Sequence, residues 1–195
     1  MPVEKAKKEA YITFVILGLV IVVLLVYVFV LRTPKPTPPS LSDASRALGT
    51  AEGQLSFTTL EGDSIDIAPR GGEEVVVVIT WASWCPPCVE ELAKLDGLAE
   101  EYQGKPVRFL AINRKEPAHI ARAFLRSVGY AENLALIIDQ EDRYFKATEG
   151  YNMPETIIYG FDENLLYQSH GAANTARLKA QLDGELARRD ERDEQ

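Results

Sequence analysis

An unbroken run of β-branched residues, Val75–Thr80, leads directly to the only two cysteines of the chain, and it leaves few folds open. Such a run is typical of a strand that is buried on both faces of a sheet. After Cys85, two prolines suit the first turn of a helix, and apolar residues then recur at three- and four-residue steps as far as Tyr102. The segment therefore predicts a central strand, a turn that carries Cys85 and Cys88, and a helix.

The spacing of the two cysteines indicates redox chemistry. Two intervening residues place both sulfurs on one helical turn, close enough to form a disulfide. At a helix N-terminus, the free N–H groups and the partial positive charge favour the thiolate, which is the attacking form of cysteine. The alternatives are a structural disulfide, a zinc site and two inert thiols. A four-residue loop gives a disulfide little entropic leverage, and the two histidines stand at no ligand spacing that would complete a zinc site.

The other apolar segments alternate between strand-like and helix-like patterns. Expected strands cover 55–60, 65–67, 107–112, 134–138, 155–159 and 165–169, and expected helices cover 86–104, 117–128 and 175–187. Strand, helix, strand, helix in succession is the order of a parallel α/β arrangement, and the closing hairpin and helix complete a small sandwich. The residues from 188 to 195 are nearly all charged, so we expect a frayed tail there.

Residues 11–31 contain no charged side chain and are long enough to cross a membrane. As a helix, these 21 residues would measure about 31 Å, which matches a hydrocarbon core of roughly 30 Å. The alternative is a cleaved signal peptide, whose apolar stretch spans only about 7 to 15 residues and ends at a small-residue cleavage site. Three lysines precede the run, whereas Arg32 and Lys35 follow it, so we expect an uncleaved anchor with a cytoplasmic N-terminus.

A proline-rich linker follows the predicted anchor. Four prolines between residues 34 and 39 favour an extended, semi-rigid tether that would hold the domain off the bilayer. The expected organisation is a cytoplasmic N-terminus at 1–10, a transmembrane anchor at 11–31, a linker at 32–50, a domain at 51–187 and a charged tail at 188–195.

The charge balance restricts the partners. The chain has 21 Lys and Arg residues against 29 Asp and Glu residues, a net charge of -8, so it offers no basic surface to neutralise a nucleic-acid backbone. The residues after Arg32 hold 27 of the 29 acidic side chains, which disfavours binding to anionic lipid. Nucleic acid and lipid substrates are therefore not expected.

The segment Val75–Cys88, which reads VVVVITWASWCPPC, resembles the redox site of thioredoxin-fold proteins, and more narrowly that of membrane-anchored TlpA/ResA-like thiol-disulfide oxidoreductases. The opening FTTLEGDSIDI resembles the N-terminal hairpin of that family, and Tyr151–Thr156, which reads YNMPET, resembles its cis-proline loop. The similarity runs from about Leu55 to Ala187. It implies a thioredoxin-like three-layer α/β sandwich with a central mixed sheet, preceded here by one N-terminal transmembrane helix.

The resemblance also implies roles for individual residues. Cys85, preceded by an exposed Trp84, would attack a substrate disulfide, and Cys88 would resolve the mixed disulfide. Pro154 would lie against the disulfide, and the backbone of Met153 would pair with the substrate chain. Cis peptide bonds occur largely at proline, so Pro154 is chemically able to take this role.

Cys88 needs a proton acceptor to become a thiolate, and the usual one is missing. Many thioredoxins carry a buried Asp six residues before the first cysteine, where this chain has Ile79. Glu91 shares a helix face with Cys88, and ResA-like proteins carry a Glu at this offset. Glu116 follows the strand at 107–113, where that group has an acidic residue near the site. We interpret both as candidate catalytic acids; the alternative is that they are solvated carboxylates near helix N-termini.

The direction of the reaction follows from the expected compartment. Because an oxidising compartment already drives oxidation, an anchored dithiol protein is most useful as a reductant that receives electrons through the membrane. The resemblance implies clients in cytochrome c maturation, such as apocytochrome c, or a copper-site protein, together with a membrane thiol electron donor and a periplasmic location. The alternatives are a non-catalytic binding or assembly module, a thiol oxidant or isomerase, and a peroxidase. We expect no metal and no cofactor.

Overall fold

The computed structural model describes residues 15–28, 56–68, 72–129 and 131–194. The chain divides into two units, Met1–Thr37 and Pro38–Gln195. In the first unit, residues 15–28 form a helix with exposed side chains. No helix within the described ranges is long and apolar enough to cross a membrane. The predicted anchor at 11–31 reaches beyond the described helix at both ends, and the predicted segments 1–10 and 32–50 lie outside the described residues.

Strand β3, Val75–Trp81, lies in the middle of the sheet, and all seven of its residues are buried. Alternate side chains point to opposite faces, so Val77 and Ile79 pack in one hydrophobic cluster and Val76 and Val78 pack in another. The β-branched run is therefore explained by burial on both faces, as its composition predicted.

The sheet has seven strands in the order β2-β1-β5-β4-β3-β6-β7. Besides β3, they are β1 (Ser56–Thr59), β2 (Ser64–Asp66), β4 (Val107–Arg114), β5 (Ala135–Asp139), β6 (Glu155–Tyr159) and β7 (Leu165–His170). The central pairs β3–β4 and β4–β5 are parallel, and all other pairs are antiparallel. The predicted central mixed sheet is confirmed.

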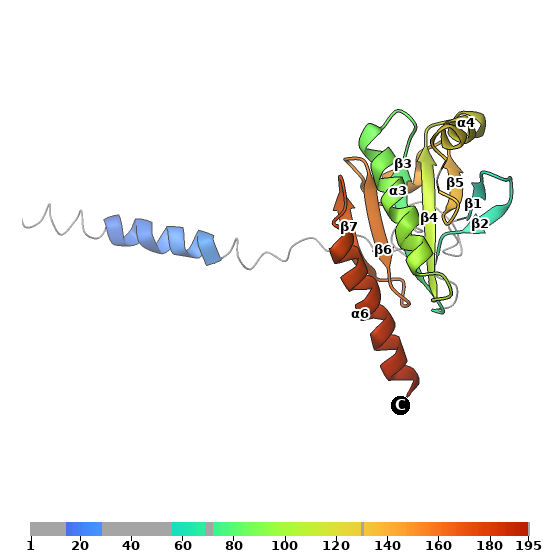
Figure 1. The fold of residues 1–195 in the computed structure, drawn as a ribbon. Coiled ribbons are helices and arrows are strands. Elements are labelled where there is room, and N and C mark those ends of the chain that lie inside the picture. The colour runs from blue at the N-terminus through green and yellow to red at the C-terminus, as the bar shows by residue number, and fades with distance from the viewer. Residues whose placement is uncertain (1–14, 29–55, 69–71, 130, 195) are drawn as a thin grey trace, which may run out of the picture. The chain divides into compact units, whose positions relative to one another are not determined.

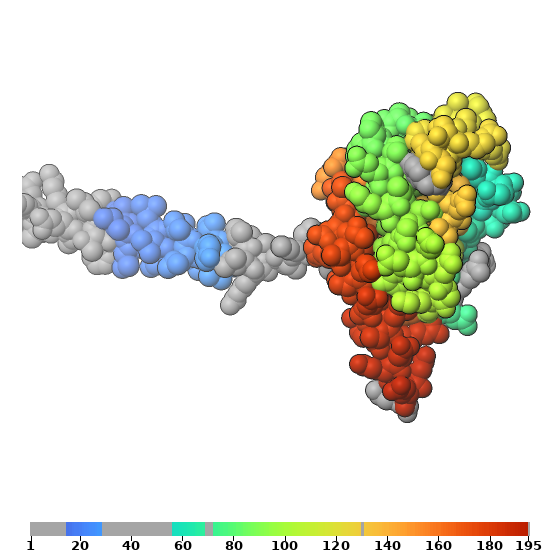
Figure 2. All heavy atoms as spheres, viewed as in Figure 1, coloured from blue at the N-terminus to red at the C-terminus, as the bar shows by residue number. Residues whose placement is uncertain are grey.

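Three helices pack on one face of the sheet: α3 (Pro86–Glu101), α4 (Ala118–Val128) and α6 (Thr175–Asp193). Figure 1 shows α3 crossing the central strands, with α6 over the β6–β7 side. Figure 2 shows these two helices side by side on the surface. The opposite face is covered by α5 (Arg143–Ala147), through Tyr144, and by side chains of the β1–β2 hairpin. Sequence patterning missed α5 because five residues are too few to show a helical period.

The C-terminal helix is longer than the sequence predicted. Its first turn is capped by Asn174, whose side chain accepts a hydrogen bond from the Arg177 amide, and the helix continues through Asp193. The expectation of a frayed tail from residue 188 is wrong. Residues 188–193 contain neither glycine nor proline, and the pairs Glu185–Arg188 and Arg189–Asp193 join side chains one helical turn apart.

Candidate active site

The two cysteines form a disulfide at the start of α3. Cys85 is the N-cap residue in an extended conformation, and the two prolines that follow occupy the first helical positions. The Cα atoms of the two cysteines are 5.3 Å apart, and the amide of Cys88 donates a hydrogen bond to the carbonyl of Cys85 at 3.0 Å. Cys85 is 6% exposed and Cys88 is fully buried, so Cys85 is the sulfur that a partner can reach first.

The residues predicted to bind substrate are Trp84, next to Cys85, and the Met153–Pro154 pair of the cis-proline loop. Trp84 directly precedes Cys85 and is 59% exposed. The Met153–Pro154 peptide bond is cis, in agreement with the role expected for Pro154. Met153 is half-buried against the hydrophobic cluster that contains both cysteines. The loop that ends at Pro154 therefore packs on the same apolar cluster as the disulfide.

Glu91 is a buried residue of α3, three residues after Cys88. Its Oε1 accepts a hydrogen bond from the amide of Ala173 at 3.1 Å, whereas Oε2 has no hydrogen-bond partner among the described residues. The hydroxyl of Thr156 stabilises the carboxylate, although its geometry falls short of a good hydrogen bond. Burial raises the pKa of Glu91, and the Ala173 amide only partly opposes this effect.

Glu91 lies near the position in the sheet where many thioredoxins carry a buried Asp and this chain has Ile79. Thr156 is the cross-strand neighbour of Ile79, the residue that stands where many thioredoxins carry the buried acid. Because Glu91 reaches Thr156 from α3, its carboxyl approaches the same part of the sheet from the helix side. A buried carboxyl is thus supplied by the helix that carries Cys88, instead of by the strand.

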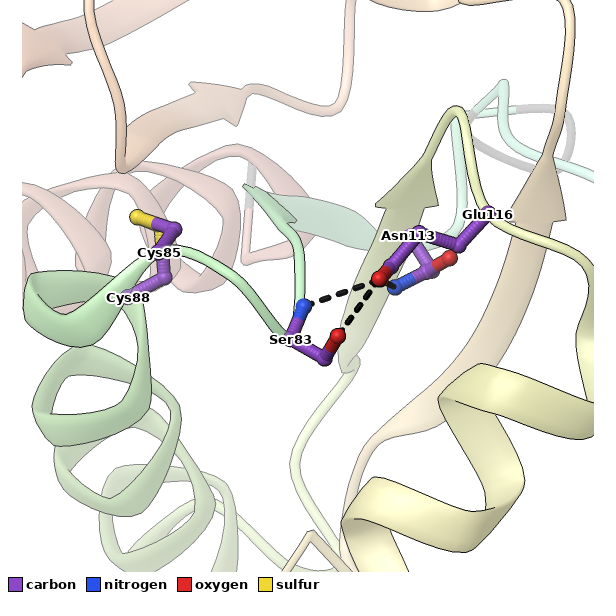
Figure 3. The surroundings of a disulfide bond; sticks show 5 residues. All are labelled: Ser83, Cys85, Cys88, Asn113 and Glu116. Carbon is purple, nitrogen blue, oxygen red and sulfur yellow. Dashed lines mark hydrogen bonds between the residues drawn. A yellow bond between two sulfur atoms is a disulfide. The ribbon is translucent and has the colours of Figure 1, made fainter.

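Glu116 supports the loop that leads to the cysteines. Its Oε2 accepts hydrogen bonds from the Ser83 amide at 2.8 Å and from the Asn113 side-chain amide at 2.7 Å, and its Oε1 accepts one from the Ser83 hydroxyl. Figure 3 shows Ser83 between this carboxylate and the disulfide. The alternative of a solvated carboxylate is wrong, because Glu116 is buried. Its contacts make it a brace between the end of β4 and the β3–α3 turn.

Sequence reasoning missed the buried carboxyl of Glu155, which directly follows the cis-proline. It is fully buried and accepts hydrogen bonds from Thr148 Oγ1 at 3.1 Å and from Gln168 Nε2 at 3.0 Å. Burial raises its pKa to about 7. The signal that could have found it is the single charged residue of the expected strand ETIIY. Within the described ranges, no three His, Cys, Asp or Glu side chains are grouped to bind a metal.

The raised pKa of Glu155 predicts a pH-dependent stability. The folded chain holds the Glu155 proton up to a pH of about 7, whereas the unfolded chain releases it near its ordinary value of 4.5. Its contribution to stability is therefore complete below pH 4.5 and is lost as the pH rises to about 7, by up to about 3 kcal/mol. Glu155→Gln should remove this loss. Urea unfolding of both proteins from pH 4.5 to 8 checks this, and a free-energy difference that does not vary with pH would contradict it.

Comparison with known proteins agrees with this fold and site. The Redoxin family matches residues 39–183. The chain is 30% identical over 118 residues to the thiol-disulfide oxidoreductase ResA of Halalkalibacterium halodurans, covering 59% of this chain and 65% of the relative. It is 31% identical over 117 residues to the thiol:disulfide interchange protein CycY of Rhizobium leguminosarum, covering 60% of each. The chain thus spans less than two thirds of these relatives.

A solved structure shares the architecture. The thiol:disulfide interchange protein of the thioredoxin family from Chlorobium tepidum superposes with a TM-score of 0.59 at 16% identity, over 78% of this chain and 98% of that protein. This likeness concerns the fold, which is thioredoxin-like. Because the family match covers most of the chain, including the disulfide, the cis-proline loop and the whole sheet, this protein belongs to the Redoxin family.

Proposed function

We propose that this chain is an extracytoplasmic thiol-disulfide oxidoreductase that reduces disulfides in client proteins. The observation that carries the proposal is the Cys85–Cys88 disulfide at the N-terminus of α3, with the more accessible sulfur next to exposed Trp84. The names of the ResA and CycY relatives support the same chemistry. A purely structural disulfide would need neither the exposed tryptophan nor a buried acid on the helix of Cys88.

The reaction is a two-electron exchange that starts from the dithiol form. The Cys85 thiolate attacks one sulfur of the client disulfide, forms a mixed disulfide and releases the other client sulfur as a thiolate, which takes up a proton. Glu91 accepts the proton of Cys88, and the Cys88 thiolate attacks the Cys85 sulfur. The second client sulfur leaves and is protonated. The client is reduced to a dithiol, and the Cys85–Cys88 pair is oxidised to the disulfide.

The proposed setting is the periplasmic side of a membrane. Support comes from the uncharged run at 11–31 and from the lysines that precede it. A membrane thiol protein would return the electrons, and apocytochrome c or a copper-site protein would be the client. Protease treatment of sealed spheroplasts that express the full chain tests the topology: the domain should be digested from outside, and its protection would overturn this placement.

Two measurements on the full chain in mild detergent test the activity. The reduction potential of the Cys85–Cys88 pair should lie near or below about -250 mV for an electron-fed reductase, whereas a value near about -120 mV would indicate an oxidant. Insulin reduction with dithiothreitol as electron source should be accelerated by the chain, and hydrogen peroxide should not be consumed. A chain that neither accelerates insulin reduction nor consumes hydrogen peroxide would instead be a binding module.

The role of Glu91 makes a separate prediction. Glu91→Gln keeps the size of the side chain but removes the proton acceptor, so resolution of the mixed disulfide by Cys88 should slow by about 10- to 100-fold. The pH–rate profile should also lose the rise that accompanies ionisation of Glu91, which burial shifts above pH 4.5. Stopped-flow tryptophan fluorescence, to which Trp81 and Trp84 both contribute, reports the rate. The adjacent exposed Glu90 supplies the control, because Glu90→Gln should match the wild type; an unchanged rate and profile in Glu91→Gln would exclude the role.

A further inference from the structure

Glu155 and His170 form an acid–base contact that takes no part in the proposed disulfide exchange. The Oε1 atom of Glu155 lies 3.0 Å from Nδ1 of His170, on the neighbouring strand β7. The distance suits an ion pair, but the ring is turned so that Nδ1, which is buried, makes no hydrogen bond of good geometry with any described residue. A carboxyl and an imidazole this close titrate as a coupled pair, so a proton held by either group, the shared proton of the pair, is lost as the pH rises.

The same histidine, His170, also contacts the cis-proline loop. Its ring stacks on that of Tyr151, with ring centroids 4.0 Å apart. The next residue, Gly171, donates a backbone hydrogen bond to the Pro154 carbonyl at 2.7 Å, in a left-handed conformation at φ +101 that favours glycine. The end of β7 thus contacts the loop at two points, Tyr151 and Pro154, one on each side of Met153.

Tyr151 is available to a polypeptide that binds along the cis-proline loop. It is 77% exposed, and it stands two residues before Met153, which packs against the cluster containing both cysteines. Outside the N-terminal helix, the exposed large hydrophobic side chains of the described residues are those of Trp84, Ile120 and Tyr151. An exposed tyrosine that is held by a stacked ring is a favourable contact for a polypeptide.

We propose that Glu155 and His170 are positioning residues that hold Tyr151 for binding of the client polypeptide, and that the shared proton of this pair makes client binding weaken as the pH rises. The inference rests on the proposed function, because it names a recognition element of the same site. Neither residue contacts the sulfurs, so the pair acts through the loop and not on the exchange step.

The surrounding charges explain the direction. The titratable and charged groups that face Glu155 are those of Arg114, Tyr144, Tyr159 and His170. Arg114 is committed to Asp142 by two hydrogen bonds of 2.6 and 2.7 Å, so it does little to neutralise Glu155. Loss of the shared proton therefore leaves a buried negative charge beside the imidazole, which loosens the contact beneath Tyr151. Burial places the pKa of Glu155 at about 7 and lowers that of His170, so this loss falls near neutrality.

The test compares recognition with chemistry on the full chain in detergent. Insulin serves as the polypeptide substrate, and hydroxyethyl disulfide serves as a small substrate that has no polypeptide to bind. In the wild type, KM for insulin should rise about fivefold between pH 6 and pH 8, which corresponds to about one hydrogen bond. Glu155→Gln imitates the protonated acid, so its KM should stay at the low value up to pH 8. The rate with hydroxyethyl disulfide should be the same in both proteins at each pH.

Further variants distinguish loss of the Tyr151 contact from loss of the folded structure. Tyr151→Ala should raise KM for insulin at every pH, and Tyr151→Phe, which keeps the stacked ring, should restore it; this side chain is exposed, so folding is not at risk. The chain has one other histidine, His119, which is exposed, and His119→Asn should behave as the wild type.

Two failures are distinguishable. If the wild type reduces insulin but Glu155→Gln keeps the pH dependence of KM, or if Tyr151→Ala leaves KM unchanged, the positioning role is overturned and the proposed function stands. If the wild type reduces insulin at no pH, the proposed function falls and this inference falls with it.

Discussion

Cys85→Ser is expected to lower insulin reduction to the rate of dithiothreitol alone, a loss of about 10³-fold or more. A serine hydroxyl does not ionise at neutral pH and cannot form a disulfide, so both the attack and the storage of two electrons are lost. Cys85 is the sulfur with measurable exposure, whereas Cys88 is fully buried. The first attack therefore depends on Cys85.

Cys88→Ser should have a different phenotype. Cys85 can still attack, but no second thiol releases the client, so a covalent chain–insulin complex should accumulate. Non-reducing electrophoresis after brief incubation with insulin, without dithiothreitol, detects this complex. The Cys85→Ser protein is the matched control and should form none. A complex with Cys85→Ser but not with Cys88→Ser would reverse the two roles.

Glu116→Ala is expected to lower the free energy of unfolding by about 3 kcal/mol. The substitution removes a buried carboxylate that accepts three hydrogen bonds, and it leaves the Ser83 amide and the Asn113 side chain without this acceptor. Because Ser83 lies in the turn between β3 and the redox helix, disulfide exchange should slow as well. Equilibrium urea unfolding and insulin reduction measure the two effects.

Two matched variants test whether the effect comes from the acceptor oxygens of Glu116. Glu116→Gln keeps one acceptor oxygen, so it should cost less than half as much as the alanine variant. Glu100 is exposed on α3, and Glu100→Ala should leave both stability and exchange within error of the wild type. If Glu116→Ala exchanges disulfides slowly but unfolds at the wild-type urea concentration, Glu116 would act on the chemistry itself and not as a brace.

Local patterns in the sequence determined most of the fold. The run Val75–Thr80 predicted a strand buried on both faces, and β3 pairs on both edges at the centre of the sheet. The same patterns located every other strand and three helices of the domain. They missed α5, which is too short to show a period, and they ended α6 too early because charged residues were interpreted as solvated tail instead of ion-paired helix.

For the candidate site too, local patterns predicted some features, and only the tertiary structure showed the others. The sequence alone predicted the redox pair, because two-residue spacing on a helix turn is a local property. The resemblance of the 151–156 loop singled out Pro154, and the structure supplied its cis isomer. Only the tertiary structure showed what the acids contact. Glu91 meets the amide of Ala173, 82 residues away, and Ser83 meets Glu116, 33 residues away. Such contacts depend on strand register and helix packing, which bring together side chains that no spacing along the chain relates.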